Sequence, residues 1–225
     1  MQKKLQRVVV VNFKSTRIGS GHSAVALAKK LDSLKENFSH FQIIVAVQPQ
    51  DIYRIAQETG LKVFAQHVDP IHYGNYSGSI CPDAIKEAGA QGTLLNHPEK
   101  KVKEADVSRT MCVCREVGLE VIICASGVAE GAALNRFSPD YIAIECEALI
   151  GKPFSLVDVY PQLVDEALLQ VDNQVLFGAG IKTNRDVRQV LMKGGSGIMV
   201  SSLILNAPDP TEALQTLLHP APTDA

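Results

Sequence analysis

The stretch Tyr141-Ile142-Ala143-Ile144-Glu145-Cys146-Glu147-Ala148-Leu149-Ile150-Gly151 holds an apolar run that ends in a carboxylate and continues into a short segment. Residues 141–144 predict a buried β-strand, which places Glu145 at its carboxyl end. An acidic residue in that position is usually no more than the polar start of a loop. Whether Glu145 has a function therefore depends on what the other strand ends contain.

The same unit, an apolar run followed by a helical pattern, recurs along the whole chain. We expect strands at residues 8–13, 41–47, 61–66, 92–95, 119–124, 141–144, 174–177 and 197–200. We expect helices at about residues 20–38, 51–58, 82–89, 103–117, 128–137, 156–169, 183–193 and 209–218. Pro82 at the start of one helix and Gly89 at its end are typical helix boundaries.

This alternation predicts an α/β protein in which residues 1–225 form a single (β/α)₈ barrel domain. The expected strands are nearly continuous apolar runs, as parallel strands covered on both faces should be. No linker rich in Pro, Gly or Ser divides the chain. The alternative, an open doubly wound sheet, would favour a G-x-G-x-x-G turn after the first strand, and residues 12–16 read Asn-Phe-Lys-Ser-Thr.

Composition excludes several classes of protein. Apolar residues make up 46% of the chain and charged residues 20%, with a formal net charge of −2, so we expect no nucleic-acid partner and no membrane surface. The basic residues 1–7 precede too short an apolar run for a signal peptide, and no run is long enough to span a bilayer. We therefore expect a cytoplasmic protein. Its five cysteines, which include a Cys112-x-Cys114 pair on two helix faces, are expected to be reduced.

In a barrel, active-site residues lie at the carboxyl ends of the strands. The first expected strand ends in Asn12-x-Lys14, and positions two apart share one face of a strand. A lysine that points into a barrel mouth is costly to bury without an anion. The pair therefore favours an anionic ligand, whereas a lone lysine after a strand is usually a surface residue.

Two histidines follow strands three and four. His67 and Asp69 share a face and could ligate Zn²⁺ or Mn²⁺, but no second His/Asp pair completes such a site, so a polar loop anchor is favoured. His97 precedes Pro98 and Glu99, which resemble the first turn of a helix. The positive end of a helix favours a neutral imidazole, which can donate to a substrate oxygen, although a histidine there is more often a simple cap.

The last two strands carry Gly178-Ala179-Gly180 and Ser196-Gly197 with Ser201-Ser202, each near an expected helix start. Barrels frequently bind phosphate with the loops after strands seven and eight, where backbone N–H groups meet the anion. Glycine also serves ordinary turns. Two such loops, one after strand seven and one after strand eight, nevertheless favour a phosphate site.

Taken together, these features resemble the triosephosphate isomerase family, and most closely its short archaeal branch. The resemblance covers about residues 8–209. The passages that carry it are Asn12-Phe13-Lys14, Ala65-Gln66-His67-Val68-Asp69-Pro70-Ile71, Asn96-His97-x-Glu99, Ile142-Ala143-Ile144-Glu145 with Leu149-Ile150-Gly151, and Gly178-Ala179-Gly180-Ile181. The His-Val-Asp passage matches a non-catalytic part of the family.

The resemblance implies isomerisation of dihydroxyacetone phosphate and D-glyceraldehyde 3-phosphate, a step of glycolysis and gluconeogenesis, with no cofactor and no metal. It implies that Glu145 is the base, that His97 is the electrophile, and that Lys14 with Asn12 stabilises the enediolate and holds substrate. The positions that it implies for substrate and phosphate binding are Asn12, Lys14, Ile150, Gly151, Gly180, Ser201 and Ser202. It also implies a homo-oligomer, either a tetramer or a dimer.

The chain departs from the family pattern in four places: Pro98 beside the histidine, residues 146–148 after the glutamate, Lys152-Pro153, and Leu203 after the second phosphate serine. Residues 146–152 match the family's lid. Because proline restricts a chain, we hypothesise a lid with more freedom near Glu145 and a far end stiffened by Pro153. Two alternatives remain open: a metal-dependent ribulose-phosphate epimerase, and a barrel of this family that has lost activity and serves as a binding protein.

Overall fold

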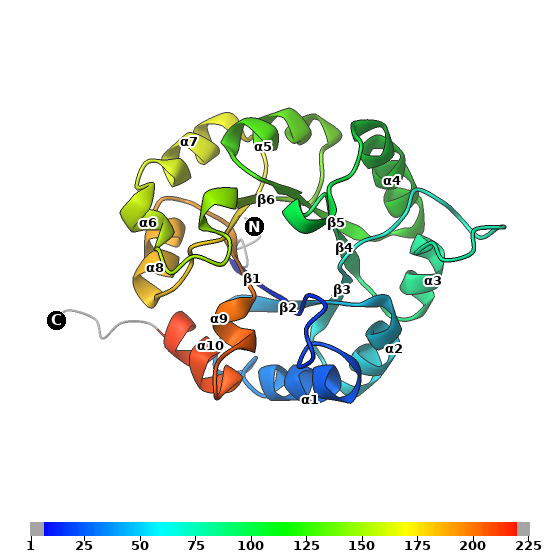
Figure 1. The fold of residues 1–225 in the computed structure, drawn as a ribbon, viewed down its shortest axis with the longest axis horizontal. Helices are drawn as coiled ribbons and strands as arrows, with labels where there is room; N and C mark the ends of the chain where they lie inside the picture. The colour runs from blue at the N-terminus through cyan, green and yellow to red at the C-terminus, as the bar shows by residue number, and fades with distance from the viewer. Residues whose placement is uncertain (1–6, 220–225) are drawn as a thin grey trace, which may run out of the picture.

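The computed structural model describes residues 7–219, whose eight parallel strands close into a barrel inside a ring of helices (Figure 1). Each strand pairs with the next and β8 pairs with β1, which confirms the predicted (β/α)₈ barrel. The basic residues 1–6 lie outside the described part. The strands are β1 Arg7–Asn12, β2 Phe41–Val47, β3 Lys62–Ala65, β4 Gly92–Leu95, β5 Glu120–Ala125, β6 Tyr141–Glu145, β7 Val175–Gly178 and β8 Gly197–Val200.

The helices of the described residues follow the strands in alternation. They are α1 Gly21–Asp32, α2 Pro49–Glu58, α3 Pro82–Glu87, α4 Glu104–Val117, α5 Val128–Leu134, α6 Leu156–Val159, α7 Leu163–Gln170, α8 Asn184–Met192, α9 Ser202–Leu205 and α10 Pro210–Leu218. Three single 3₁₀ turns, η1 Pro98–Lys100, η2 Asn135–Phe137 and η3 Glu147–Leu149, lie between them. None of these helices is long and apolar enough to cross a membrane.

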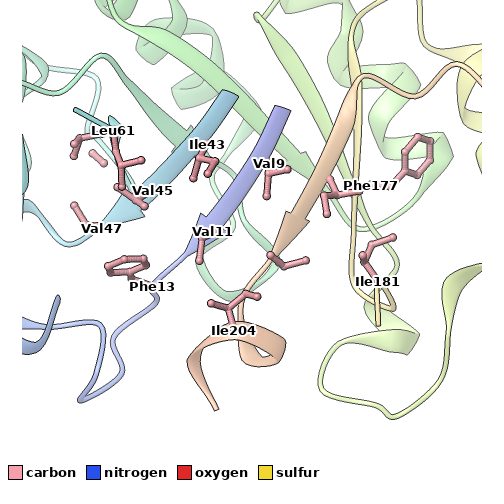
Figure 2. Packing of buried hydrophobic residues seen from close by; sticks show 14 of the residues in the cluster. Val9, Val11, Phe13, Ile43, Val45, Val47, Leu61, Phe177, Ile181 and Ile204 are labelled. Carbon is pink, nitrogen blue, oxygen red and sulfur yellow. The ribbon is translucent and has the colours of Figure 1, made fainter. Parts of the chain in front are cut away.

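The strands are apolar along their whole length because both of their faces are buried. Val8 and Val10 of β1 belong to a cluster inside the barrel, whereas Val9 and Val11 belong to the larger cluster that also includes helix residues. Figure 2 shows Val9 and Val11 in this larger cluster together with residues of β2, β7 and α9. Gly197 permits closure of the barrel, because a Cβ atom there would lie 1.9 Å from the carbonyl oxygen of Val8.

The first helix is shorter than the sequence predicted. We expected it to reach residue 38, but α1 ends at Asp32, and residues 33–40 form successive turns before β2. Leu31, Leu34 and Phe38 are all buried, so helical spacing continues past the end of the helix. The N–H of Lys35 bonds to the carbonyl of Asp32, a three-residue turn that does not extend α1. Apolar spacing alone therefore misplaced the boundary.

The expected helix at residues 156–169 is divided into α6 and α7. The break lies at Tyr160 and Pro161, where Tyr160 adopts φ −131° and ψ 65°. Proline has no N–H to donate and disfavours helical geometry in the preceding residue. The break leaves α6 as one turn directly after the lid. Helix α9, a single turn after β8, was also not predicted.

Candidate active site

Two pockets that share Asn12, Lys14 and His97 lie at the carboxyl ends of the strands, and Glu145 lines one of them. The structure brings together in the lining of that pocket all nine residues that the sequence predicted for catalysis and phosphate binding: Asn12, Lys14, His97, Glu145, Ile150, Gly151, Gly180, Ser201 and Ser202. The roles of these residues stay predictions. Four residues that the sequence analysis did not count as site residues also line the pocket: Leu149, Ile181, Lys182 and Leu203. Ser196, by contrast, precedes β8 and lies at the opposite end of the barrel.

Glu145 is the last residue of β6, and its side chain points into the pocket beside His97. Both residues are buried, with exposures of 7% and 6%. The Oε1 atom of Glu145 lies 3.0 Å from Nε2 of His97. The two atoms are not aligned as a hydrogen bond, and Oε1 has no other donor among the described residues. A buried carboxylate oxygen without a donor is costly, and it is free to accept a proton from a bound molecule.

Space for Glu145 is provided by Gly178, its partner across the β6–β7 pairing. A Cβ atom on Gly178 would lie 2.9 Å from Cγ of Glu145. Such an approach is closer than real Cβ contacts. A larger residue at the end of β7 would therefore displace the carboxylate from its present position.

The tautomer of His97 is set by a hydrogen bond from the backbone of Glu99. The backbone N–H of Glu99 donates to Nδ1 of His97 over 3.2 Å, so Nδ1 carries no proton in this arrangement. The proton of a neutral ring then resides on Nε2, the atom that faces Glu145. Pro98 and Glu99 form the first turn of a helix, as the sequence predicted, and His97 caps it. This helix is the isolated 3₁₀ turn η1, since α4 begins only at Glu104.

The residue before His97 holds this loop in place, and sequence reasoning missed it. Asn96 is buried and has φ 59°, a left-handed conformation that asparagine tolerates better than most residues. Its side-chain amide donates to the carbonyl of Cys124 and to Glu130, at 3.0 and 2.9 Å, and its Oδ1 accepts the N–H of Val102. The loop that carries His97 is thereby tied to β5 and α5.

Lys14 lies beside Asn12 for a reason different from the one expected. Strand β1 ends at Asn12, and Lys14 has φ 49°, so strand alternation does not apply to it. Instead, Oδ1 of Asn12 accepts the backbone N–H of Lys14 at 3.0 Å, and the Lys14 carbonyl accepts Nε2 of Gln66. A non-glycine residue with positive φ stores of order 1–3 kcal/mol of strain, typically at functional sites. The turn directs Lys14 to the pocket.

The ammonium group of Lys14 pairs with a carboxylate 85 residues further along the chain. Its Nζ donates to Oε1 of Glu99 over 2.6 Å. Oε2 of Glu99 lies 3.7 Å from Nδ1 of His97. Glu99 therefore contacts the cation through its side chain and the imidazole through its backbone. Sequence reasoning quoted Glu99 within a family passage but did not count it as a site residue.

The opposite side of the pocket offers backbone donors. Among the described residues, the N–H groups of Gly180, Ile181, Ser202 and Leu203 have no internal acceptor. All four residues line the pocket. Unpaired N–H groups that converge on a cavity suit an anion, because each gains a charge-assisted hydrogen bond. Leu203 replaces the glycine of the family pattern, but a backbone donor does not depend on its side chain.

The segment that matches the family's lid, residues 146–152, lines part of this pocket. Its centre is the turn η3, and its Leu149 is buried. Gly151 has φ 70°, which glycine adopts without strain. Ile150 and Gly151 both line the pocket. The hypothesis of unequal freedom at the two ends of the lid stays a prediction.

His67 and Asp69 lie at the neck of the long loop between β3 and α3. Asp69 Oδ1 lies 3.3 Å from Nε2 of His67, and Oδ2 accepts the N–H of Ile80 at 2.7 Å. Asp69 therefore joins the two ends of the loop, as a polar anchor does. Within residues 7–219, no group of three or more His, Cys, Asp or Glu side chains is arranged to hold a metal ion.

None of the five cysteines, all within residues 7–219, lines the pocket that contains Glu145. All five are free thiols. Cys112 is exposed and Cys114 is buried, so the two side chains occupy different faces of α4, as predicted. Burial raises the pKa of the Cys114 thiol to about 12, which disfavours the reactive thiolate.

Comparisons with known proteins agree with the fold and with the sequence resemblance. The family model described as triosephosphate isomerase matches residues 7–217. The chain is 39% identical over 216 residues to triosephosphate isomerase from Methanosarcina barkeri, with 94% of this chain and 97% of the relative covered. It is 34% identical to that of Methanocaldococcus jannaschii, with 94% and 98% covered.

A solved structure supports the architecture. The crystal structure of triosephosphate isomerase from Bartonella henselae matches with a TM-score of 0.70 and covers 94% of this chain and 98% of its own. Its sequence is only 18% identical, so this likeness supports the fold alone.

Proposed function

The chain belongs to the triosephosphate isomerase family, and we propose that Glu145, His97 and Lys14 perform its reaction. That reaction interconverts dihydroxyacetone phosphate and D-glyceraldehyde 3-phosphate, a step of glycolysis and gluconeogenesis. The observation that carries the assignment is the 3.0 Å distance between Oε1 of Glu145 and Nε2 of His97 at the base of the pocket. A base and a donor are thus adjacent where substrate would bind.

The reaction moves a proton between two neighbouring carbons. Glu145 removes a proton from C1 of dihydroxyacetone phosphate, which places negative charge on the carbonyl oxygen and gives an enediolate. The same carboxyl group returns the proton to C2, while the hydroxyl proton on the C1 oxygen moves to the C2 oxygen, which leaves the aldehyde at C1. The buried Oε1 suits this role, because no donor among residues 7–219 is aligned with it.

The two substrate oxygens need donors while the charge develops. In our proposal, the N–H at Nε2 of His97 bonds to these oxygens, and the Lys14 ammonium stabilises their negative charge. The N–H from Glu99 to Nδ1 supports the required tautomer. Asn12, whose Oδ1 binds the Lys14 backbone, helps to hold the lysine in the pocket.

The phosphate of the substrate would bind on the opposite side of the same pocket. We assign it to the free N–H groups of Gly180, Ile181, Ser202 and Leu203, with Ser201 and the lid residues Ile150 and Gly151 beside them. Lys182 also lines the pocket and adds a cation on this side. A closed lid would exclude water from the enediolate. A cytoplasmic homo-oligomer, either dimer or tetramer, belongs to the same proposal, and light scattering of the purified protein tests its size.

A coupled assay tests the function directly. The purified chain is incubated with D-glyceraldehyde 3-phosphate, with and without a chelator, and formation of dihydroxyacetone phosphate is followed. Rapid isomerisation that does not change with the chelator is the expected result. Activity that requires a metal would instead favour the epimerase-type alternative, and a folded protein without isomerase activity would favour a binding role.

A further inference from the structure

The carboxylate of Asp186 joins two loops at the mouth of the barrel. Asp186 belongs to the first turn of α8 and is only 1% exposed. Its Oδ2 atom accepts the N–H groups of Lys182 and Thr183, at 3.0 and 2.8 Å, and the Thr183 hydroxyl at 2.9 Å. Its Oδ1 atom accepts the hydroxyl of Ser155, 31 residues earlier in the chain. The bonds to Lys182 and Thr183 are sufficient to cap α8, so the bond to Ser155 is additional.

Ser155 lies where the lid joins α6, and one hydrogen bond and one close approach of the chain link this region to the β7–α8 loop. The N–H of Leu156 donates to the carbonyl of Gly180 over 2.9 Å. Gly180 has φ 92°, and a Cβ atom there would lie 2.8 Å from Cδ1 of the lid residue Leu149. Figure 1 shows α6 and α8 side by side on this flank of the barrel.

The other end of the lid is held less firmly. Its bond to a neighbouring loop runs from the N–H of Glu147 to the carbonyl of Ser126 and is 3.4 Å long. The bonds of Leu149 to Cys146 and of Ile150 to Glu147 lie within the lid itself. The end after Pro153 is thus fixed to the β7–α8 loop, whereas the end near Cys146 is not fixed to the same degree.

We propose that Asp186 is a positioning residue that holds the far end of the lid and the phosphate-binding loop together as one unit. This inference rests on the proposed function, which assigns the N–H groups of Gly180 and Ile181 to the phosphate. Because Oδ2 engages the N–H groups of Lys182 and Thr183, it fixes the loop in which the free donors lie. Through Ser155, Oδ1 fixes the lid to that same loop. Binding of phosphate and closure of the lid are thereby coupled.

Ser155→Ala tests the coupling, because it removes the hydroxyl and leaves the cap of α8 intact. We expect kcat/KM for D-glyceraldehyde 3-phosphate to fall about tenfold, as for one lost hydrogen bond to a carboxylate. Proton exchange of D-glyceraldehyde in D₂O, a substrate without phosphate, should not change. Ser155→Thr keeps the hydroxyl and should restore the rate. Asp158→Ala is the matched control, since it removes the exposed ion pair of α6 with Arg185 of α8.

Calorimetric binding of inorganic phosphate separates this inference from the proposed function. Weaker phosphate binding by Ser155→Ala, and at least as much weakening by Asp186→Asn, supports the coupling even if the wild-type protein does not isomerise. Wild-type phosphate affinity in folded Ser155→Ala would overturn it, as would an equal loss of rate with both substrates. Thermal melts of every variant establish that it is folded.

Discussion

Nε2 of His97 lies 3.0 Å from Oε1 of Glu145, although the two residues come from strand ends that are not adjacent in the barrel. The opposite nitrogen of the same ring accepts a backbone N–H, which directs the proton of the neutral imidazole toward the carboxylate. A donor and a base thus share one buried space. Substrate oxygens and a substrate carbon would bind in the pocket beside them.

Replacement of Glu145 by Gln removes the proposed base and keeps its size. We expect kcat to fall by at least about 10²-fold, since general acid-base catalysis contributes 10²–10⁴-fold. The exposed carboxylate Glu166 on α7 provides the control, and Glu166→Gln should remain near wild-type activity. The coupled assay measures both. Near-normal turnover in folded Glu145→Gln would refute the role of Glu145.

Lys14→Ala removes the proposed cation from the pocket. We expect turnover to drop by at least about 10²-fold, because loss of one group that stabilises the developing oxyanion costs 10²–10³ in rate. Lys30 is exposed on α1, and Lys30→Ala serves as the control. If a folded Lys14→Ala variant retained most of its activity, the enediolate would have to be stabilised by another group.

Gly180→Ala should destabilise the fold and weaken phosphate binding. The residue has φ 92°, and an added Cβ would lie 2.8 Å from the Leu149 side chain and 2.9 Å from the Leu156 backbone nitrogen. Alanine at positive φ costs at least about 1 kcal/mol, and the contact with backbone adds to this. Urea denaturation measures the change in free energy of unfolding. Gly127→Ala is the matched control, because no described residue beyond its two chain neighbours lies within 4 Å of its added Cβ. An equal effect of the two substitutions would contradict the argument.

His72 should make stability depend on pH. The side-chain hydrogen bond to Asp83 raises the pKa of His72, with a further contribution from Glu116, and the two bonds measure 3.0 Å each. A raised folded-state pKa gives stabilisation that is fully present below the unfolded-state pKa of about 6.5 and is lost as pH rises through the folded-state value.

Thermal melts between about pH 5 and pH 9 test this dependence. The loss of Tm in His72→Gln relative to wild type should be largest at the acidic end and should shrink as pH rises. The exposed His22 on α1 is replaced by Gln as a control. A loss of Tm in His72→Gln that is constant over this pH range would show that the charge of His72 does not contribute.

The lid should move more at its Glu145 end than at its Pro153 end. Residues 146–149 lack the bonds to the β7–α8 loop that Ser155 and Leu156 make. Backbone NMR order parameters on the nanosecond scale should therefore be lower at residues 146–149 than at residues 153–156. A lid as rigid as the barrel strands in the absence of ligand would rule this out.

The order of strands and helices could be read from the sequence because both patterns are local. Buried parallel strands are apolar at every position, and each was followed by a helical pattern, so the eightfold repeat predicted the barrel. The predicted helix boundaries were wrong where local patterns misled. Leu34 and Phe38 continue the apolar spacing of α1 after the helix has ended. Pro161 divided a helix whose apolar residues had suggested one element.

By itself, the sequence determined which strand ends meet at the site, because a barrel brings all carboxyl strand ends to one mouth. Only the tertiary structure decided how they contact one another. The bond of Lys14 to Glu99, the support of Asn96 by Glu130, and the bond of Ser155 to Asp186 join residues far apart in the chain. Such contacts depend on the backbone angles of the loops and on side-chain packing between separate strand–helix units. Neither is encoded in the local pattern of apolar and polar residues.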